Sequence, residues 1–115
     1  MADAPARKQL AVLPPGTLIL LILRVLRPNP LHGYAIAQRI RQLSSDELSV
    51  EEGSLYPALQ KALANGWLKA EWTTSETGRE VRSYRLTAKG LKQLDTEQKD
   101  YQRMATAIAA IFDAT

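Results

Sequence analysis

The sequence predicts a mainly α-helical fold with a small β-hairpin (α+β), in which a winged helix-turn-helix is followed by one long helix. Three observations carry this prediction: three segments with helical spacing in the first half, two β-type runs on either side of Gly78, and a heptad-spaced C-terminal segment. Three helices followed by a basic hairpin form the outline of a winged helix-turn-helix. A chain of 115 residues fits one such unit and makes two domains unlikely on length alone.

The first half of the chain reads as two helices separated by a turn. Residues 6–13 could form a short helix that ends at Pro14-Pro15. A nearly all-apolar helix follows from Thr17 to about Arg27, and this composition predicts that it is mostly buried. The prolines of residues 28–33 predict a turn, and helical spacing resumes from Tyr34, with apolar residues at Ile36, Ala37, Ile40 and Leu43.

A third helix is expected after the loop at residues 44–47, although its start is ambiguous. Ser49 and Glu52 have the spacing of a capping box, which would place the first helical residue at Val50 and Pro57 in the second turn. Alternatively, Ser54 caps the helix and Pro57 sits in the first turn, where its missing N–H costs little. We favour one helix with a distorted beginning. Asn65-Gly66 should end it, and its buried stripe comprises Leu55, Ala58, Leu59, Ala62 and Leu63.

The second half predicts a hairpin and a long helix. Residues 67–74 and 80–87 are rich in aromatic and branched side chains, and their connector contains Gly78. Thr87 is the expected cap of a helix that runs to about Phe112. Residues of this helix alternate spacings of three and four, which is typical of a coiled-coil seam: Leu91, Leu94, Gln98, Tyr101, Ala105, Ile108 and Phe112. So small a domain offers such a seam little to pack on, so we expect it to pack on a second copy.

Composition limits the possible functions. The chain has no cysteine, which excludes disulfides, thiolate zinc sites and cysteine nucleophiles. The nine-residue apolar run from Leu18 to Leu26 contains Arg24 and is shorter than the roughly 20 residues of a membrane span. The N-terminus lacks the apolar core of a signal peptide. We therefore expect a soluble, cytoplasmic protein with no membrane partner.

Charge alternates along the chain. Its net charge is +3, but residues 44–59 carry −4 and residues 60–92 carry +4. The basic zone at residues 60–92 covers the end of the third helix and the hairpin, and such a zone suits a nucleic acid.

Four segments together resemble the PadR family of bacterial transcriptional regulators: "GTLILLILRVL", "PLHGYAIAQRI", "LSVEEGSLYPALQKALANGWLKAEW" and "RSYRLTAKG". The resemblance covers roughly residues 10 to 110, and the order of its motifs is specific. It implies a homodimeric repressor that binds double-stranded DNA at a partly palindromic operator and dimerises through its C-terminal helix. The single terminal helix resembles the family's short subgroup. Residues 1–87 would then form the DNA-binding domain, including an N-terminal arm or helix, and residues 88–115 the dimerisation helix.

The third helix and the hairpin supply the candidate DNA contacts. Small and hydroxyl residues at the start of the third helix would allow close approach to DNA, and the helix N-terminus favours phosphate. The expected contacts are Tyr34, Ser54, Tyr56, Pro57, Gln60, Lys61, Arg79 and Arg82. Alternatively, Ser54 merely caps, Tyr56 packs under the hairpin, the Tyr34 ring belongs to the core and the arginines are solvated. Glu51 and Glu52 disfavour DNA, and we expect them at the edge of the interface. The expected dimer contacts are Leu91, Leu94, Tyr101, Ala105, Ile108 and Phe112.

Other functions have weaker support. His32 is the only histidine, so it is expected to be structural and not a metal ligand, and no cofactor is expected. Ser54 has no histidine near it in sequence and no glycine-rich phosphate loop is present, so we expect no enzymatic activity. The resemblance also implies a small, often aromatic effector. Its possible walls are Trp67, Trp72, Tyr101 and Phe112, although each fits the core or the dimer seam better. The alternative function is a winged-helix module that binds protein and not DNA.

Overall fold

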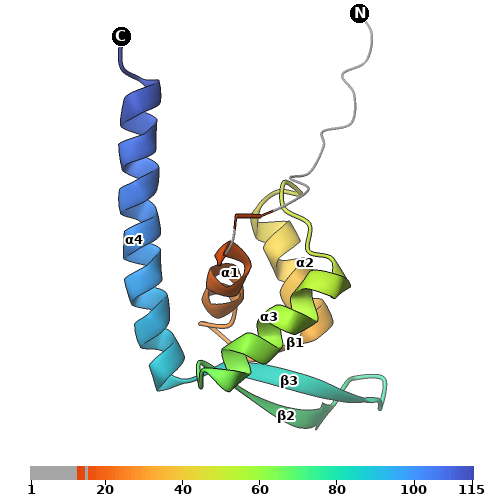
Figure 1. Ribbon diagram of the computed structural model, residues 1–115. Coiled ribbons are helices and arrows are strands. Elements are labelled where there is room, and N and C mark those ends of the chain that lie inside the picture. Colours follow the sequence, from red (N-terminus) through yellow and green to blue (C-terminus); the bar gives the residue numbers. More distant parts are fainter. Residues whose placement is uncertain (1–12, 15) are drawn as a thin grey trace, which may run out of the picture.

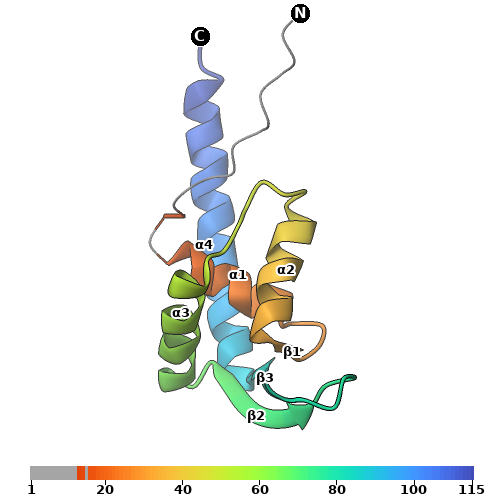
Figure 2. The same ribbon diagram turned by 90° about the vertical axis from the view of Figure 1, so that its right-hand side faces the viewer.

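The fold is the expected α+β class, and the described part of the chain forms four helices and a three-stranded antiparallel sheet (Figure 1). The computed structural model describes residues 13–14 and 16–115, so the helix expected at residues 6–13 lies, except for Leu13, outside the described residues. The elements are α1 (Thr17–Val25), β1 (Leu31–His32), α2 (Gly33–Leu43), α3 (Glu52–Ala64), β2 (Leu68–Thr74), β3 (Glu80–Leu86) and α4 (Ala88–Phe112). In two views at right angles, α1 to α3 lie on one side of the sheet, and α4 extends beyond them (Figures 1 and 2).

One core joins the three short helices, the sheet and the first turns of α4. Its largest fully buried side chains are Ile22, Leu23, Ile36, Leu59 and Leu94. Leu68 and Tyr84 bring the sheet into the same cluster. Burial of such side chains removes apolar surface from water and is the main force that holds the helices on the sheet.

The sheet contains a strand that the sequence pattern did not predict. β3 lies in the middle, with β2 on one side and β1 on the other. Leu31 pairs with Tyr84, and His32 pairs with Ser83. The expected two-stranded hairpin is therefore a three-stranded sheet, because the segment after Pro30 adds two residues to its edge. We call β2, β3 and their connecting loop the wing (residues 68–86).

The beginning of α3 differs from the expected capping box. The helix starts at Glu52, and Glu51 occupies the N-cap position without a side-chain cap hydrogen bond. The prediction of a start at Val50, capped by Ser49 and Glu52, is therefore wrong. The segment is nevertheless one helix, as we favoured. Pro57 lies in its second turn, where it cannot donate a hydrogen bond to the carbonyl of Gly53.

The ends of the other elements follow the sequence signals. Gly66, with φ of 75°, turns the chain after α3, and Gly78, with φ of 82°, lies in the wing loop. Both adopt the left-handed region that glycine tolerates best. The expected cap at Thr87 is confirmed, since its hydroxyl accepts a hydrogen bond from the N–H of Gly90 at 2.9 Å.

Thr87 also joins α4 to the end of α3. Its hydroxyl donates to the carbonyl of Gly66 at 2.6 Å, and its backbone N–H donates to the carbonyl of Trp67 at 3.0 Å. Gly90 sits against the same turn, and a Cβ there would overlap the Trp67 carbonyl oxygen. Only one residue separates β3 from α4. The wing, the end of α3 and the start of α4 therefore meet at one junction.

Candidate nucleic-acid interface

The outward side of α3 carries all the residues of this helix that the sequence predicts to contact DNA. Leu55, Leu59 and Ala62 face the core. The opposite side is exposed and presents Ser54, Tyr56, Pro57, Gln60 and Lys61. Helical periodicity explains this division, because the apolar residues recur on one stripe and leave the others on the solvent side.

The two flanks of α3 face different surroundings. Tyr56 and Gln60 line a groove between α3, the start of α2 and the wing, which we call the aromatic groove. Its lining comprises His32, Gly33, Tyr34, Tyr56, Gln60, Trp72, Glu80, Val81, Arg82 and Tyr84. Ser54 and Lys61 instead line a hollow against the start of α1. The structure thus brings together Tyr34, Tyr56, Gln60 and Arg82, and it places Ser54 and Lys61 on the other flank.

The wing positions its arginines through strand register. Arg82 lies directly opposite Trp72, and Ala70 lies opposite Tyr84, so these residues share one face of the sheet. The guanidinium carbon of Arg82 is 5.9 Å from the centroid of the Tyr84 ring, a cation–π distance. Tyr84 itself is buried in the core.

The wing loop holds Arg79 at the far end of the hairpin. The N–H of Ser75 donates to the carbonyl of Arg79 at 2.7 Å, and the N–H of Arg79 donates to the Ser75 hydroxyl at 3.2 Å. The ion pairs of the described residues 13–14 and 16–115 engage neither Arg79 nor Arg82. Both guanidinium groups are exposed and can bind an external anion.

Electrostatic features around the groove are mixed. Burial raises the pKa of the Tyr84 phenol, with a smaller opposing effect from Arg82, so the hydroxyl stays protonated at neutral pH.

Glu51 and Glu52 are exposed at the start of α3. The expectation that Glu52 folds back as a capping-box partner is not met, so its charge faces solvent. Within the acidic segment, Asp46 accepts a hydrogen bond from Arg41 at 2.9 Å.

Exposed large apolar side chains gather in two places. Three of them line the aromatic groove: Tyr34, Tyr56 and Trp72. Six lie on α4: Leu91, Tyr101, Met104, Ile108, Ile111 and Phe112. Only Leu43 lies in neither group among the described residues. Such clusters of exposed apolar surface mark interaction sites.

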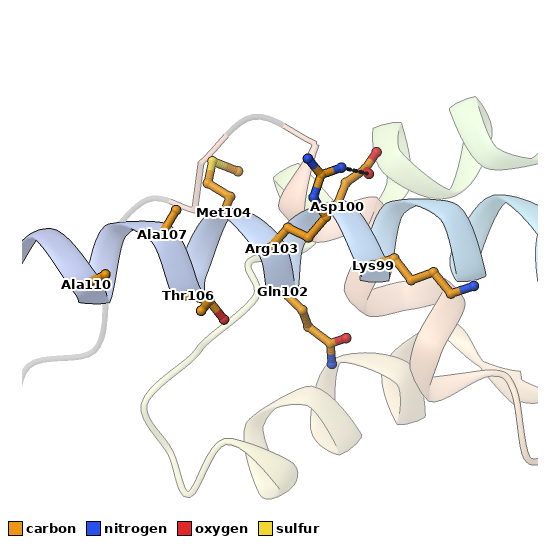
Figure 3. A pocket seen from close by; sticks show the side chains of 8 residues that line it. All are labelled: Lys99, Asp100, Gln102, Arg103, Met104, Thr106, Ala107 and Ala110. Atoms are coloured by element: carbon orange, nitrogen blue, oxygen red, sulfur yellow. Dashed lines mark ion pairs between the residues drawn. The ribbon is translucent and has the colours of Figure 1, made fainter.

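The structure corrects one predicted dimer residue and adds two candidates. Leu94 has no exposed surface because it packs in the core, so its assignment to a dimer interface is wrong. Met104 and Ile111 are exposed beside the predicted seam, one position before Ala105 and Phe112. Met104 and Ile111 are seven residues apart, so they share one heptad position. This position lies next to the two positions of the seam and widens the apolar face of α4. Figure 3 shows Met104 with neighbouring side chains of α4, including the Arg103–Asp100 ion pair at 4.0 Å.

Trp72 is the groove residue that sequence reasoning misplaced. We expected a core or seam position, but its side chain is 68% exposed. The alternation of β2 places Trp72 on the same face as Ala70, turned toward the helices, but it does not indicate how much of that face is covered. Trp67, in contrast, packs against the core as expected.

Two further observations concern metals and membranes. In the described part of the chain, no three acidic, histidine or cysteine side chains gather where they could hold a metal ion. His32 is exposed at the N-cap of α2 and makes no side-chain cap hydrogen bond. Of the helices in residues 16–115, none combines the length and apolarity that a membrane crossing requires.

The order of the elements, with a wing beside α2 and α3, defines a winged helix-turn-helix protein. The transcriptional regulator PadR-like family matches residues 22–96, which is more than half of the chain. The chain therefore belongs to the PadR-like family of transcriptional regulators. Among curated proteins, no sequence matches it.

Solved structures agree with this assignment. A PadR-like transcription factor from Bacteroides fragilis is 28% identical, with a TM-score of 0.69 over 84% of this chain and 90% of its own. A PadR family transcriptional regulator from Eggerthella lenta is 26% identical, with a TM-score of 0.72 over 87% and 85%. A PadR-like transcriptional regulator from Bacillus cereus, at 23% identity, shares the fold with a TM-score of 0.76 over 87% and 95%.

Proposed function

We propose that the protein is a homodimeric repressor that binds double-stranded DNA at a partly palindromic operator and is released by a small-molecule effector. The observation that carries the DNA-binding part is the exposed aromatic groove beside the outward side of α3. Family membership as a transcriptional regulator agrees with it.

On the DNA side, α3 would enter the major groove and the wing would reach the backbone or the minor groove. Gln60 and Lys61 are exposed and would meet base edges or phosphate. Tyr34, at the start of α2, would donate its hydroxyl to a phosphate across the same groove. Arg79 and Arg82, which lack ion pairs in the described chain, would supply sequence-independent charge.

The dimer proposal rests on the second half of α4. Residues 99–112 are exposed along their whole length, yet they carry Tyr101, Met104, Ile108, Ile111 and Phe112. An isolated helix of this length is marginal in water, and most helical stability in proteins comes from packing an apolar face. The corresponding helix of a second copy would cover this face. Leu91, Tyr101, Ala105, Ile108 and Phe112 remain the proposed contacts.

The effector proposal concerns four aromatic residues. Its candidate walls are dispersed in one protomer: Trp67 packs on the core, Trp72 lines the groove, and Tyr101 and Phe112 lie on α4. An effector would act by binding one dimer geometry better than another, and it could shift the equilibrium only by that difference in affinity.

The test is fluorescence anisotropy of a labelled duplex from upstream of the protein's own gene, beside a scrambled duplex of equal length, at two salt concentrations. We expect preferential, salt-sensitive binding at two protomers per site. Sedimentation at micromolar concentration should give a dimer. Absence of binding to either duplex at low salt would refute DNA binding and favour the alternative of a protein-binding module.

A further inference from the structure

The aromatic groove exposes three large rings that the core does not use. Tyr34 is 72% exposed, Tyr56 is 53% exposed and Trp72 is 68% exposed, and all three line the same groove. Tyr34 and Tyr56 have assigned roles in the proposed DNA contact. Trp72 has none, although an exposed tryptophan forgoes more apolar burial than any other side chain.

Trp72 is held on a rigid part of the wing. It lies in the interior of β2, directly opposite Arg82 on β3, so its position is fixed by strand pairing and not by the loop. Arg82 in turn lies over the ring of the buried Tyr84. The indole and the guanidinium group are therefore neighbours on one face of the sheet, and both line the groove.

We propose that Trp72 packs its indole ring against the sugar–phosphate backbone of the bound duplex, so that the aromatic groove seats one DNA strand. This inference rests on the proposed function. A deoxyribose offers an apolar face next to an anionic phosphate, and the groove offers aromatic rings next to Arg82. The indole also carries an N–H donor for a phosphate oxygen.

A backbone contact fits this geometry better than base stacking. Aromatic side chains stack on bases that are unpaired and splayed out, as in single strands. An intact duplex keeps its bases stacked, so a ring on a wing meets sugars and phosphates first. Glu80 also lines the groove, two register pairs nearer the wing tip than Arg82. Its carboxylate repels phosphate, so the strand would lie on the Tyr34 side of Arg82.

The first experiment compares Trp72→Ala with the wild-type protein on the upstream and scrambled duplexes. We expect about a tenfold loss of affinity on both, the order of magnitude for losing the partial burial of one aromatic side chain, with an unchanged salt slope because no charge is removed. Arg82→Ala should instead lower the salt slope by about one counterion. Trp72→Phe should retain most of the affinity. Leu43→Ala is the matched control, because Leu43 is 60% exposed but lies outside the groove.

The second experiment follows the indole directly. The chain has two tryptophans, so the emission of a Trp67→Phe variant reports Trp72 alone. Added duplex should shift this emission to shorter wavelength and protect it from acrylamide quenching. Circular dichroism checks that each variant is folded.

The outcomes separate this inference from the proposed function. If the wild type binds DNA but Trp72→Ala binds equally well and the emission does not change, the Trp72 contact is refuted and the proposed function stands. A loss confined to the upstream duplex would also refute a backbone contact, since it would mean base reading. If the wild type binds neither duplex, both proposals fail.

Discussion

Gly90→Ala tests how tightly the junction at Thr87 is packed. A Cβ at Gly90 would overlap the carbonyl oxygen of Trp67 and lie 2.8 Å from Cδ1 of Leu86. The carbonyl cannot move aside freely, because it accepts the N–H of Thr87 at 3.0 Å. Overpacking costs about 1–3 kcal/mol, and contact with backbone places this site at the upper end. Alanine favours the helix by about 1 kcal/mol relative to glycine, which offsets part of this cost. We expect a net loss of about 2 kcal/mol in the free energy of unfolding.

The same substitution at Gly53 is the matched control. Gly53 lies in the first turn of α3, and a Cβ there would meet nothing within 4 Å. Alanine should therefore stabilise the protein by about 0.5–1 kcal/mol. In thermal unfolding followed by circular dichroism, we expect Tm to fall by about 10 °C for Gly90→Ala and to rise by a few degrees for Gly53→Ala. Protomer concentration must be equal, because dimers gain stability with concentration. A Gly90→Ala variant as stable as wild type would refute the close approach.

Three other predictions concern the wing, α4 and the core. Arg79→Ala should weaken binding similarly on all sequences and lower the salt slope by about one counterion; an unchanged affinity and slope would remove the wing loop from the interface. The double variant Tyr101→Asp, Ile108→Asp should sediment as a monomer. The control Thr106→Asp, which lies on another side of α4, should remain dimeric. A monomeric wild type would contradict the dimer proposal. Burial raises the pKa of Tyr84 above 10.0, so the unfolded state releases the phenol proton at lower pH than the folded state does. The free energy of unfolding should therefore fall as pH rises through and above 10. In alkaline denaturation, Tyr84→Phe should lack this loss of stability.

The helices, the hairpin and most of their ends, with the exception of the start of α3, could be predicted because each has a local cause. Gly66 and Gly78 take left-handed conformations, and Thr87 caps the helix that follows it. These are short-range effects that a few neighbouring residues determine. β1 could not be predicted in this way, because a two-residue strand has no periodicity and exists only through its pairing with Ser83 and Tyr84.

The candidate site was predictable in its parts but not in its grouping. Periodicity placed Tyr56 and Lys61 on the outward side of α3, but only packing shows that they face different flanks. Leu94 and Trp72 were misplaced for a related reason. An apolar residue in a heptad or strand pattern indicates which face it occupies, whereas burial depends on what covers that face. α1 packs on α4 in the core that encloses Leu94, whereas no helix or strand of residues 16–115 covers Trp72.

The junction at Thr87 makes α4 a lever. The helix has 25 residues and is about 37 Å long at 1.5 Å per residue. One end is fixed to the end of α3 and to the wing by Thr87 and Gly90, while the other end reaches the region proposed for contact with the second copy. A tilt of about 10° at the junction displaces the far end by about 6 Å. In the reverse direction, a far end held by a second copy would convert a small change in the tilt of α4 into a change in the separation of the two α3 helices proposed to read DNA. The operator spacing that the proposed dimer accepts would then depend on how stiffly the surroundings of Gly90 hold the start of α4.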